Sequence, residues 1–235
     1  MEQPTTTTPP NPVATWKQWR VTAGLLALSA VPIIAGASRL QQLSSGATVT
    51  EANQRFFDQP LPVVLHIVGA TVFCVLGAFQ FVPSLRRRRW HRIAGRIALP
   101  MGLVASLSGL WMTFIYEWPA GDELSLAVVR TVVGVGMTAS LVLALTAIRR
   151  RDIRAHRAWV TRGYALGLGA GTQVLTHLPF VAVTGHPPLG WTRTFLMALA
   201  WGINLAVAEW AIRRSPLGRP MPRRAAPSAV PVTAA

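Results

Sequence analysis

The chain is poor in the residues and motifs that usually carry covalent and metal chemistry. It has one cysteine, Cys74, so neither an intrachain disulfide nor a cysteine metal cluster can form. Its 235 residues contain no phosphate-binding glycine loop, no nucleophile elbow and no zinc-protease helix motif. The sequence therefore assigns no reaction, and it leaves open whether the protein is an enzyme.

Acidic residues are also scarce, with 8 Asp and Glu against 23 Lys and Arg and a net charge of +15. Such a charge is often a sign of nucleic-acid binding. Here the basic residues, all but one of them arginine, lie between long apolar runs, where they hold loops on the cytoplasmic side of a membrane. We therefore expect a lipid bilayer as the partner and no nucleic acid.

Charge is absent from long stretches of the chain. Five stretches without a charged residue run for 18, 27, 20, 18 and 30 residues, and a sixth of 19 residues contains only Glu209. A helix needs about 20 apolar residues to cross a hydrocarbon core of about 30 Å. The sequence therefore predicts an all-α integral membrane bundle of six transmembrane helices, which cover about 19–38, 61–83, 97–117, 127–148, 163–184 and 193–212.

Basic residues are divided unequally between the two sides of these spans. Nineteen lie in the two terminal segments and in the connections after the second and fourth spans, whereas the other side has only Arg39, Arg55, Arg130 and Arg193. The positive-inside rule then places both termini in the cytoplasm, with the arginines near anionic lipids of the inner leaflet.

One domain is expected, from residue 17 to residue 214. The tail 1–16 is rich in Thr and Pro, and the basic tail 215–235 is rich in Pro, Ala and Arg, so both are expected to be disordered. The first span follows basic residues and has a long apolar run, which favours a retained signal anchor over a cleaved signal peptide.

Two histidines lie within the apolar spans at about the same depth below the external surface. They are His66 in the second span and His177 in the fifth. If these spans face each other, the two imidazoles could ligate the iron of one b-type haem, with Arg130 and Arg193 near its propionates. The alternative is that both are neutral groups that hydrogen-bond to neighbouring helices or handle protons.

Two further histidines, His91 and His156, lie in similar connections, each with a basic run, a His-Arg pair and a later arginine. The similarity predicts two related helix pairs, which would place these histidines near each other on the cytoplasmic side. A quinone, haem or metal site at His91 and His156 is one interpretation of this pair. The favoured one is binding of lipid phosphate or another anionic group by Arg92, Arg96, Arg157 and Arg162.

Two other expectations concern charge and helix continuity. Glu209 and Arg213 are four residues apart on the sixth span, so we expect them to pair. The third and fifth spans show no sign of the interrupted helices typical of transporters, and Arg130 is the only candidate for a buried charge. The continuity of these spans and the presence of a single candidate buried charge both argue against transport.

Four short motifs occur between residues 60 and 180: Leu65-His66, Gly77-Ala78-Phe79-Gln80-Phe81, His91-Arg92-x-x-Gly95-Arg96 and His156-Arg157-x-Trp159-x-x-Arg162. Together they resemble a family of bacterial multi-pass membrane proteins catalogued as domain of unknown function 2306. The resemblance implies a bacterial cytoplasmic membrane protein without an established activity. Val160-Thr161 departs from the family pattern, where a more apolar pair with Met is expected.

Three functions are compatible with these observations. The first is a haem-binding protein in membrane electron transfer or in assembly of a respiratory complex. The second is a transporter of small solutes or protons, and the third is a non-catalytic scaffold whose histidines are structural. A membrane redox partner or a second copy of the chain fits each of them.

Overall fold

A computed structural model of the protein describes residues 12–86, 88–119 and 121–214. Within this part the chain forms helices and connections and contains no strand. The elements are α1 (Pro12–Ser45), α2 (Gln54–Asp58), α3 (Pro60–Gln80), the 3-10 turn η1 (Pro83–Leu85), α4 (Arg89–Ile115), α5 (Leu124–Arg149), α6 (Ile153–Gly167), α7 (Gly169–Thr184) and α8 (Gly190–Arg214).

Five of the described helices are long and apolar enough to cross a membrane, and α6 with α7 makes a sixth if the bent pair is one span. The predicted all-α membrane bundle is confirmed. The helices differ from the predicted spans mainly at their ends. α4 begins at Arg89 because a helix can continue through polar residues beyond the hydrocarbon core, and α3 ends at Gln80 because Pro83 holds Val82 in an extended conformation.

The two tails lie largely outside the described residues. Residues 1–11 and 215–235, for which we expect disorder, are not described. Residues 12–16 belong to the same expected tail, but they form the first turns of α1.

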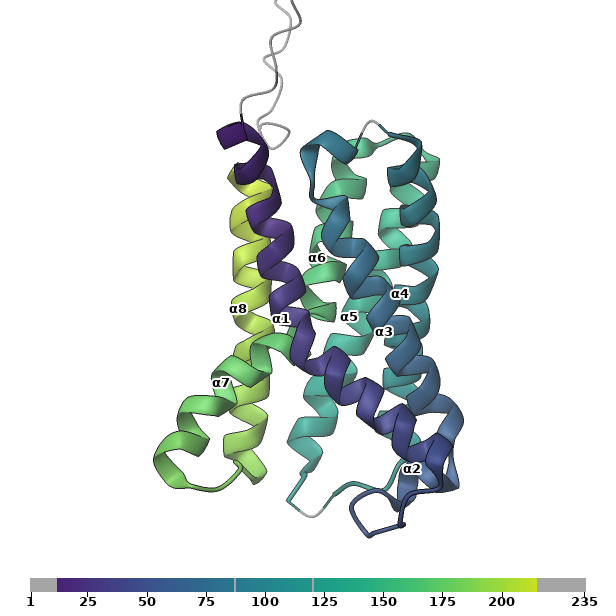
Figure 1. Cartoon of the computed structure of the whole chain (residues 1–235), viewed down its shortest axis with the longest axis vertical. Coiled ribbons are helices and arrows are strands. Elements are labelled where there is room, and N and C mark those ends of the chain that lie inside the picture. The colour runs from purple at the N-terminus through teal and green to yellow at the C-terminus, as the bar shows by residue number, and fades with distance from the viewer. Residues whose placement is uncertain (1–11, 87, 120, 215–235) are drawn as a thin grey trace, which may run out of the picture.

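Helices α3 to α6 form two antiparallel hairpins, α3–α4 and α5–α6, that pack together as a four-helix bundle (Figure 1). Helix α1 crosses this bundle obliquely and contacts α3 and α7, while α8 packs against α7, α6 and α5. We call the end with the connections 81–88 and 150–152 the basic end. The opposite end, with the connections 46–59, 116–123 and 185–189, is the loop end.

The chain bends by 43° between α6 and α7. Four glycines lie between residues 163 and 171, and glycine weakens a helix by about 1 kcal/mol relative to alanine. Gly169 also leaves room for α8, because a Cβ there would lie 1.9 Å from the indole nitrogen of Trp201. The bend therefore lies beside Trp201 of α8.

Side chains of α8 satisfy the backbone groups that the bend frees. Asn204 Nδ2 donates to the carbonyl of Ala165 at 3.0 Å, and Trp201 Nε1 donates to the carbonyl of Leu166 at 3.2 Å. In a continuous helix these carbonyls would accept from the N–H groups four residues later. Because an unsatisfied carbonyl is costly inside a membrane, these bonds allow the break to exist there. The expectation of an uninterrupted fifth span is therefore wrong.

Candidate functional site

A cavity of about 430 Å³ lies within the loop-end half of the bundle. Its deep wall is mainly apolar and includes Ile67, Phe73 and Met137, together with Leu166 and Leu168 at the α6–α7 break. Toward the loop end the lining becomes charged. The charged side chains that line this loop-end cavity are Arg55, Glu117, Asp122, Arg130 and Arg193.

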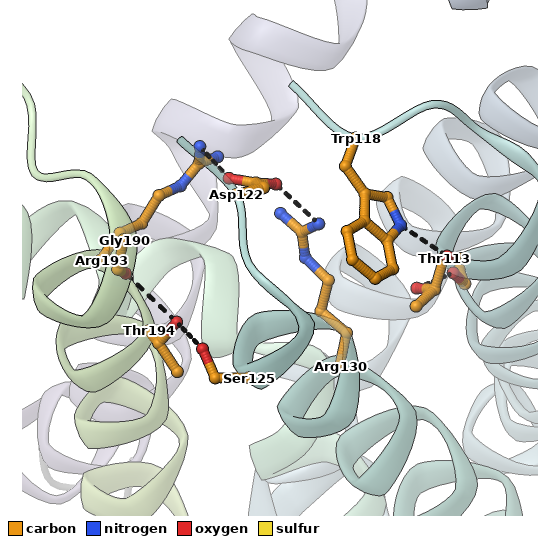
Figure 2. Close-up of polar contacts among 9 residues, drawn as sticks. Thr113, Trp118, Asp122, Ser125, Arg130, Gly190, Arg193 and Thr194 are labelled. Carbon is orange, nitrogen blue, oxygen red and sulfur yellow. Dashed lines mark hydrogen bonds and ion pairs between the residues drawn. The ribbon is translucent and has the colours of Figure 1, made fainter. Parts of the chain in front are cut away.

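Asp122 is at the centre of this charged rim. It belongs to the connection between α4 and α5, and its side chain is 2% exposed. Arg130 of α5 donates to Asp122 Oδ2 at 3.1 Å, and Arg193 of α8 pairs with Oδ1 (Figure 2). A carboxylate this buried is stable only when it is paired. Asp122 therefore ties α5 to α8 across the mouth of the cavity.

Neutral hydrogen bonds hold the same rim together. The hydroxyls of Ser125 and Thr194 lie 3.0 Å apart and join α5 to α8 (Figure 2). The N–H of Gly190 donates to the carbonyl of Gly121 at 2.8 Å, which fastens the first residue of α8 to the α4–α5 connection. These bonds hold the segment that carries Asp122 against the start of α8, the helix that carries Arg193.

Arg55 of α2 adds a third guanidinium to the rim. Its guanidinium carbon lies 4.6 Å from the centre of the Phe56 ring, and that of Arg39 lies 4.4 Å from the same ring. Of these two arginines, only Arg55 lines the cavity. Burial lowers the pKa of Arg55 from its ordinary value, and nearby Asp122 opposes the shift. Within the described residues Arg55 has no ion pair.

His66 lines the apolar part of the same cavity. Its Nδ1 lies 2.8 Å from the carbonyl oxygen of Ala105 in α4. Because a carbonyl can only accept, this nitrogen carries the proton and Nε2 keeps the lone pair. His66 is therefore a polar group at the wall of the cavity, held in orientation by α4.

His177 has different surroundings from His66. It lies on α7, where its Nδ1 donates to the carbonyl of Gln173 on the same helix at 2.8 Å, and it does not line the loop-end cavity. Helix α7 packs against α8 and α1, whereas α3 with His66 packs mainly against α4 and α1. The structure does not bring the two histidines together in one cavity. Ligation of a haem by the pair stays a prediction, which an oxidised and a dithionite-reduced absorption spectrum of purified protein would test.

A second cavity, of about 1160 Å³, lies at the basic end. His91 and His156 both line it, as the similarity of their connections predicts. His156 Nδ1 donates to the carbonyl of Ala144 at 2.8 Å, whereas His91 Nδ1 and Gln80 Nε2 are buried and have no hydrogen-bond partner among the described residues. Of the four arginines predicted to bind an anionic group, three line this basic-end cavity and Arg96 does not.

Glu209 forms a different ion pair from the one expected. Its carboxylate accepts two hydrogen bonds from Arg162 of α6, at 2.5 Å from Nε and 3.1 Å from Nη2. Arg213 makes no direct pair with it. The expected pairing of Glu209 with Arg213 is therefore wrong, because the close packing of α8 against α6 offers a bidentate partner. Arg162 also lies 4.6 Å from the ring centre of Trp159.

Sequence reasoning missed Asp122 and Arg55 as site residues. It identified Arg193 as a possible haem-propionate partner, and Arg130 as such a partner and as the only candidate for a buried charge. That last expectation is wrong, because the side chain of Asp122 is 2% exposed. A usable signal was present in the charge bias. Four arginines lie at the end that the predicted orientation places outside, where the positive-inside rule disfavours them, and three of them line the loop-end cavity. The few arginines that depart from the charge bias are therefore the signal that could have pointed to this site.

Several apolar helices around two internal cavities define a multi-pass helical membrane protein. A family model described as "Predicted membrane protein (DUF2306)" matches residues 63–212. The chain belongs to this family, and the resemblance seen in its motifs is confirmed. No curated protein and no solved structure matches the chain.

Proposed function

We propose that the protein binds a small organic anion in the loop-end cavity and transports it across the membrane. The observation that carries this proposal is the set of three arginines, Arg55, Arg130 and Arg193, at the mouth of a largely apolar internal cavity. Charge at the mouth would attract an anion, and the apolar wall would accommodate the body of the same molecule.

The charge of the rim favours an anion. Three arginines and two acidic residues line the cavity, which leaves one net positive charge. The Asp122 carboxylate is shared between two guanidiniums, and each guanidinium has further N–H donors for a ligand. Arg55 is left with an aromatic ring as its neighbour. At this half-buried rim, such a surplus of donors attracts a carboxylate, sulfonate or phosphate group.

The α6–α7 break supports transport in particular. In many transporters, substrate sites lie near the middle of the membrane, beside helices that are interrupted there. The break at Leu168 lines the loop-end cavity through Gly167, Leu168 and Ala170. At about 430 Å³ the cavity falls within the range of small-molecule sites.

Binding can be tested with 2-naphthalenesulfonate, a permanently anionic probe with an apolar body, on purified protein in lipid nanodiscs. Its neutral counterpart is naphthalene-2-sulfonamide. Fluorescence titration is expected to show the sulfonate binding at least tenfold more tightly than the sulfonamide. Equal affinities would mean that the arginines do not select charge, which contradicts the proposal.

The residue-level test compares two arginines that share one aromatic ring. Arg55→Gln is expected to weaken sulfonate binding about tenfold or more, because a hydrogen bond to a charged group contributes about 1.5–3 kcal/mol. Arg39→Gln is the matched control and should leave binding unchanged, since Arg39 does not line the cavity. Uptake of the sulfonate into proteoliposomes should fall with Arg55→Gln in the same proportion. Binding without any uptake would refute transport.

A further inference from the structure

Phe73 of α3 lines both the loop-end cavity and the basic-end cavity. It lies 13 residues from the loop-end start of α3 and 7 from its other end, or about 20 Å and about 10 Å along the helix. The residue is only 3% exposed. One buried aromatic residue therefore forms part of the wall between two cavities that lie toward opposite ends of the bundle.

The ring of Phe73 fits between two glycines on different helices. A Cβ at Gly102 of α4 would lie 2.7 Å from the ring, and a Cβ at Gly167 of α6 would lie 2.8 Å from it. Tyr164 packs at 5.5 Å between ring centres, and Leu141 belongs to the same buried cluster. The layer between the two cavities is thus apolar and tightly packed, so it closes the path to charged solutes.

The basic-end cavity has a lining that suits the same class of ligand as the loop-end cavity. Several arginines line it, among them Arg86, Arg92 and Arg157, against two acidic residues. Both acids have partners, because Glu209 binds Arg162 and Asp152 accepts from the N–H of Ala155 at the start of α6. Cationic cavities thus lie on both sides of the Phe73 layer.

We infer that the two cavities are the halves of one anion route through the bundle and that Phe73 is its gate. This inference rests on the proposed function, since it assigns the basic-end cavity as the second site for the same anion. The α6–α7 break supplies the hinge. Gly167, the last residue of α6, faces the Phe73 ring, so a change of angle at Leu168 would alter the space available to that ring.

Thiol labelling from each side of the membrane tests the gate. Two reporters are made in a Cys74→Ala background, because Cys74 itself lines the loop-end cavity. Ala70→Cys lies in the loop-end cavity and Ala158→Cys in the basic-end cavity. The reagent is sulfonatoethyl methanethiosulfonate, an anion that does not cross lipid, applied to intact cells and to inside-out vesicles. With Phe73 in place, each reporter should react from one side only.

Phe73→Ala should open the route, so that each reporter reacts from both sides and the previously protected reaction becomes at least tenfold faster. Phe73→Leu, which keeps an apolar side chain, should give a smaller increase. Phe114→Ala is the matched control, since Phe114 is 70% exposed and lines neither cavity. When each rate is divided by the same reagent's rate with a free thiol in solution, the cationic reagent trimethylammonioethyl methanethiosulfonate should react more slowly than the anionic one through the opened route.

The outcomes separate the gate from the proposed function. One-sided labelling that persists in Phe73→Ala and Phe73→Leu proteins that still bind 2-naphthalenesulfonate overturns the gate and leaves anion binding standing. An opened route in a protein that binds no sulfonate even with Phe73 in place overturns the proposed function and leaves the gate. A route that opens equally for the cationic reagent overturns the assignment of both cavities to an anion.

Discussion

At the loop end of the bundle, arginines from three helices meet at the mouth of one cavity around a buried carboxylate, whereas at the basic end most of the described arginines are exposed. The loop-end arginines, Arg55, Arg130 and Arg193, are all half-buried. Two of them pair with an acid whose side chain is 2% exposed. At the loop end, a few charges are held in defined contacts. At the basic end, many charges are exposed to solvent or to lipid headgroups.

This difference separates two roles of arginine in a membrane protein. A solvated arginine beside a lipid headgroup contributes about 1 kcal/mol of attraction to an anionic surface and can move freely. A buried arginine loses hydration, so its burial is stable only if a paired acidic group offsets the cost of that loss. The loop end therefore carries the more specific information about function, although it has far fewer basic residues.

The largest effect that we predict comes from Asp122→Asn. The substitution leaves Arg130 and Arg193 without a carboxylate, and breaking a buried ion pair costs about 3 kcal/mol or more. Unfolding of purified protein in mixed micelles should show this loss of stability. Glu117→Gln is the control, because Glu117 lies in the same connection but is exposed, and it should change stability by less than about 0.5 kcal/mol. Equal effects of the two variants would mean that the buried pairing of Asp122 contributes no more than an exposed acid of the same connection.

The membrane spans could be predicted from the sequence because each depends on local composition. A stretch of about 20 residues without charge has one favourable environment, whatever its neighbours are. The bend in the fifth span depends on residues far away along the chain. Trp201 and Asn204 of α8 satisfy the carbonyls that the bend frees, and nothing near residue 168 shows that these partners will arrive.

The histidine pair shows the same limit. Depth in the membrane follows from counting residues, so His66 and His177 could be assigned to one layer. The neighbours of each helix and the direction of each side chain depend on packing. His66 turns to the carbonyl of Ala105 in α4, and His177 turns to its own helix. His91 and His156 line one cavity, as the similarity of their two connections predicts.

A smaller effect is expected from Glu209→Gln at the basic end. Glu209 and Arg162 form a bidentate pair, but their side chains are 33% and 27% exposed, so water screens the interaction. The expected loss of stability is about 1 kcal/mol, by the same unfolding measurement. Arg213→Gln should have no such effect, because Arg213 does not pair directly with Glu209. A larger loss of stability in Arg213→Gln than in Glu209→Gln would instead support the pairing of Glu209 with Arg213 that their spacing predicts.

The smallest effect is predicted for Arg96→Gln. Arg96 is exposed on α4, lines neither cavity and has no ion pair among the described residues, so its removal should change stability by less than about 0.5 kcal/mol. Orientation should not change either, because basic residues at the basic end outnumber those at the loop end by far. Reporter fusions after Arg154 and after Gly121, in the protein with and without the substitution, should keep activity on the cytoplasmic and the external side respectively. A loss of more than about 1 kcal/mol would mean that exposed arginines at the basic end also hold specific contacts, and the contrast between the two ends would then be one of number alone.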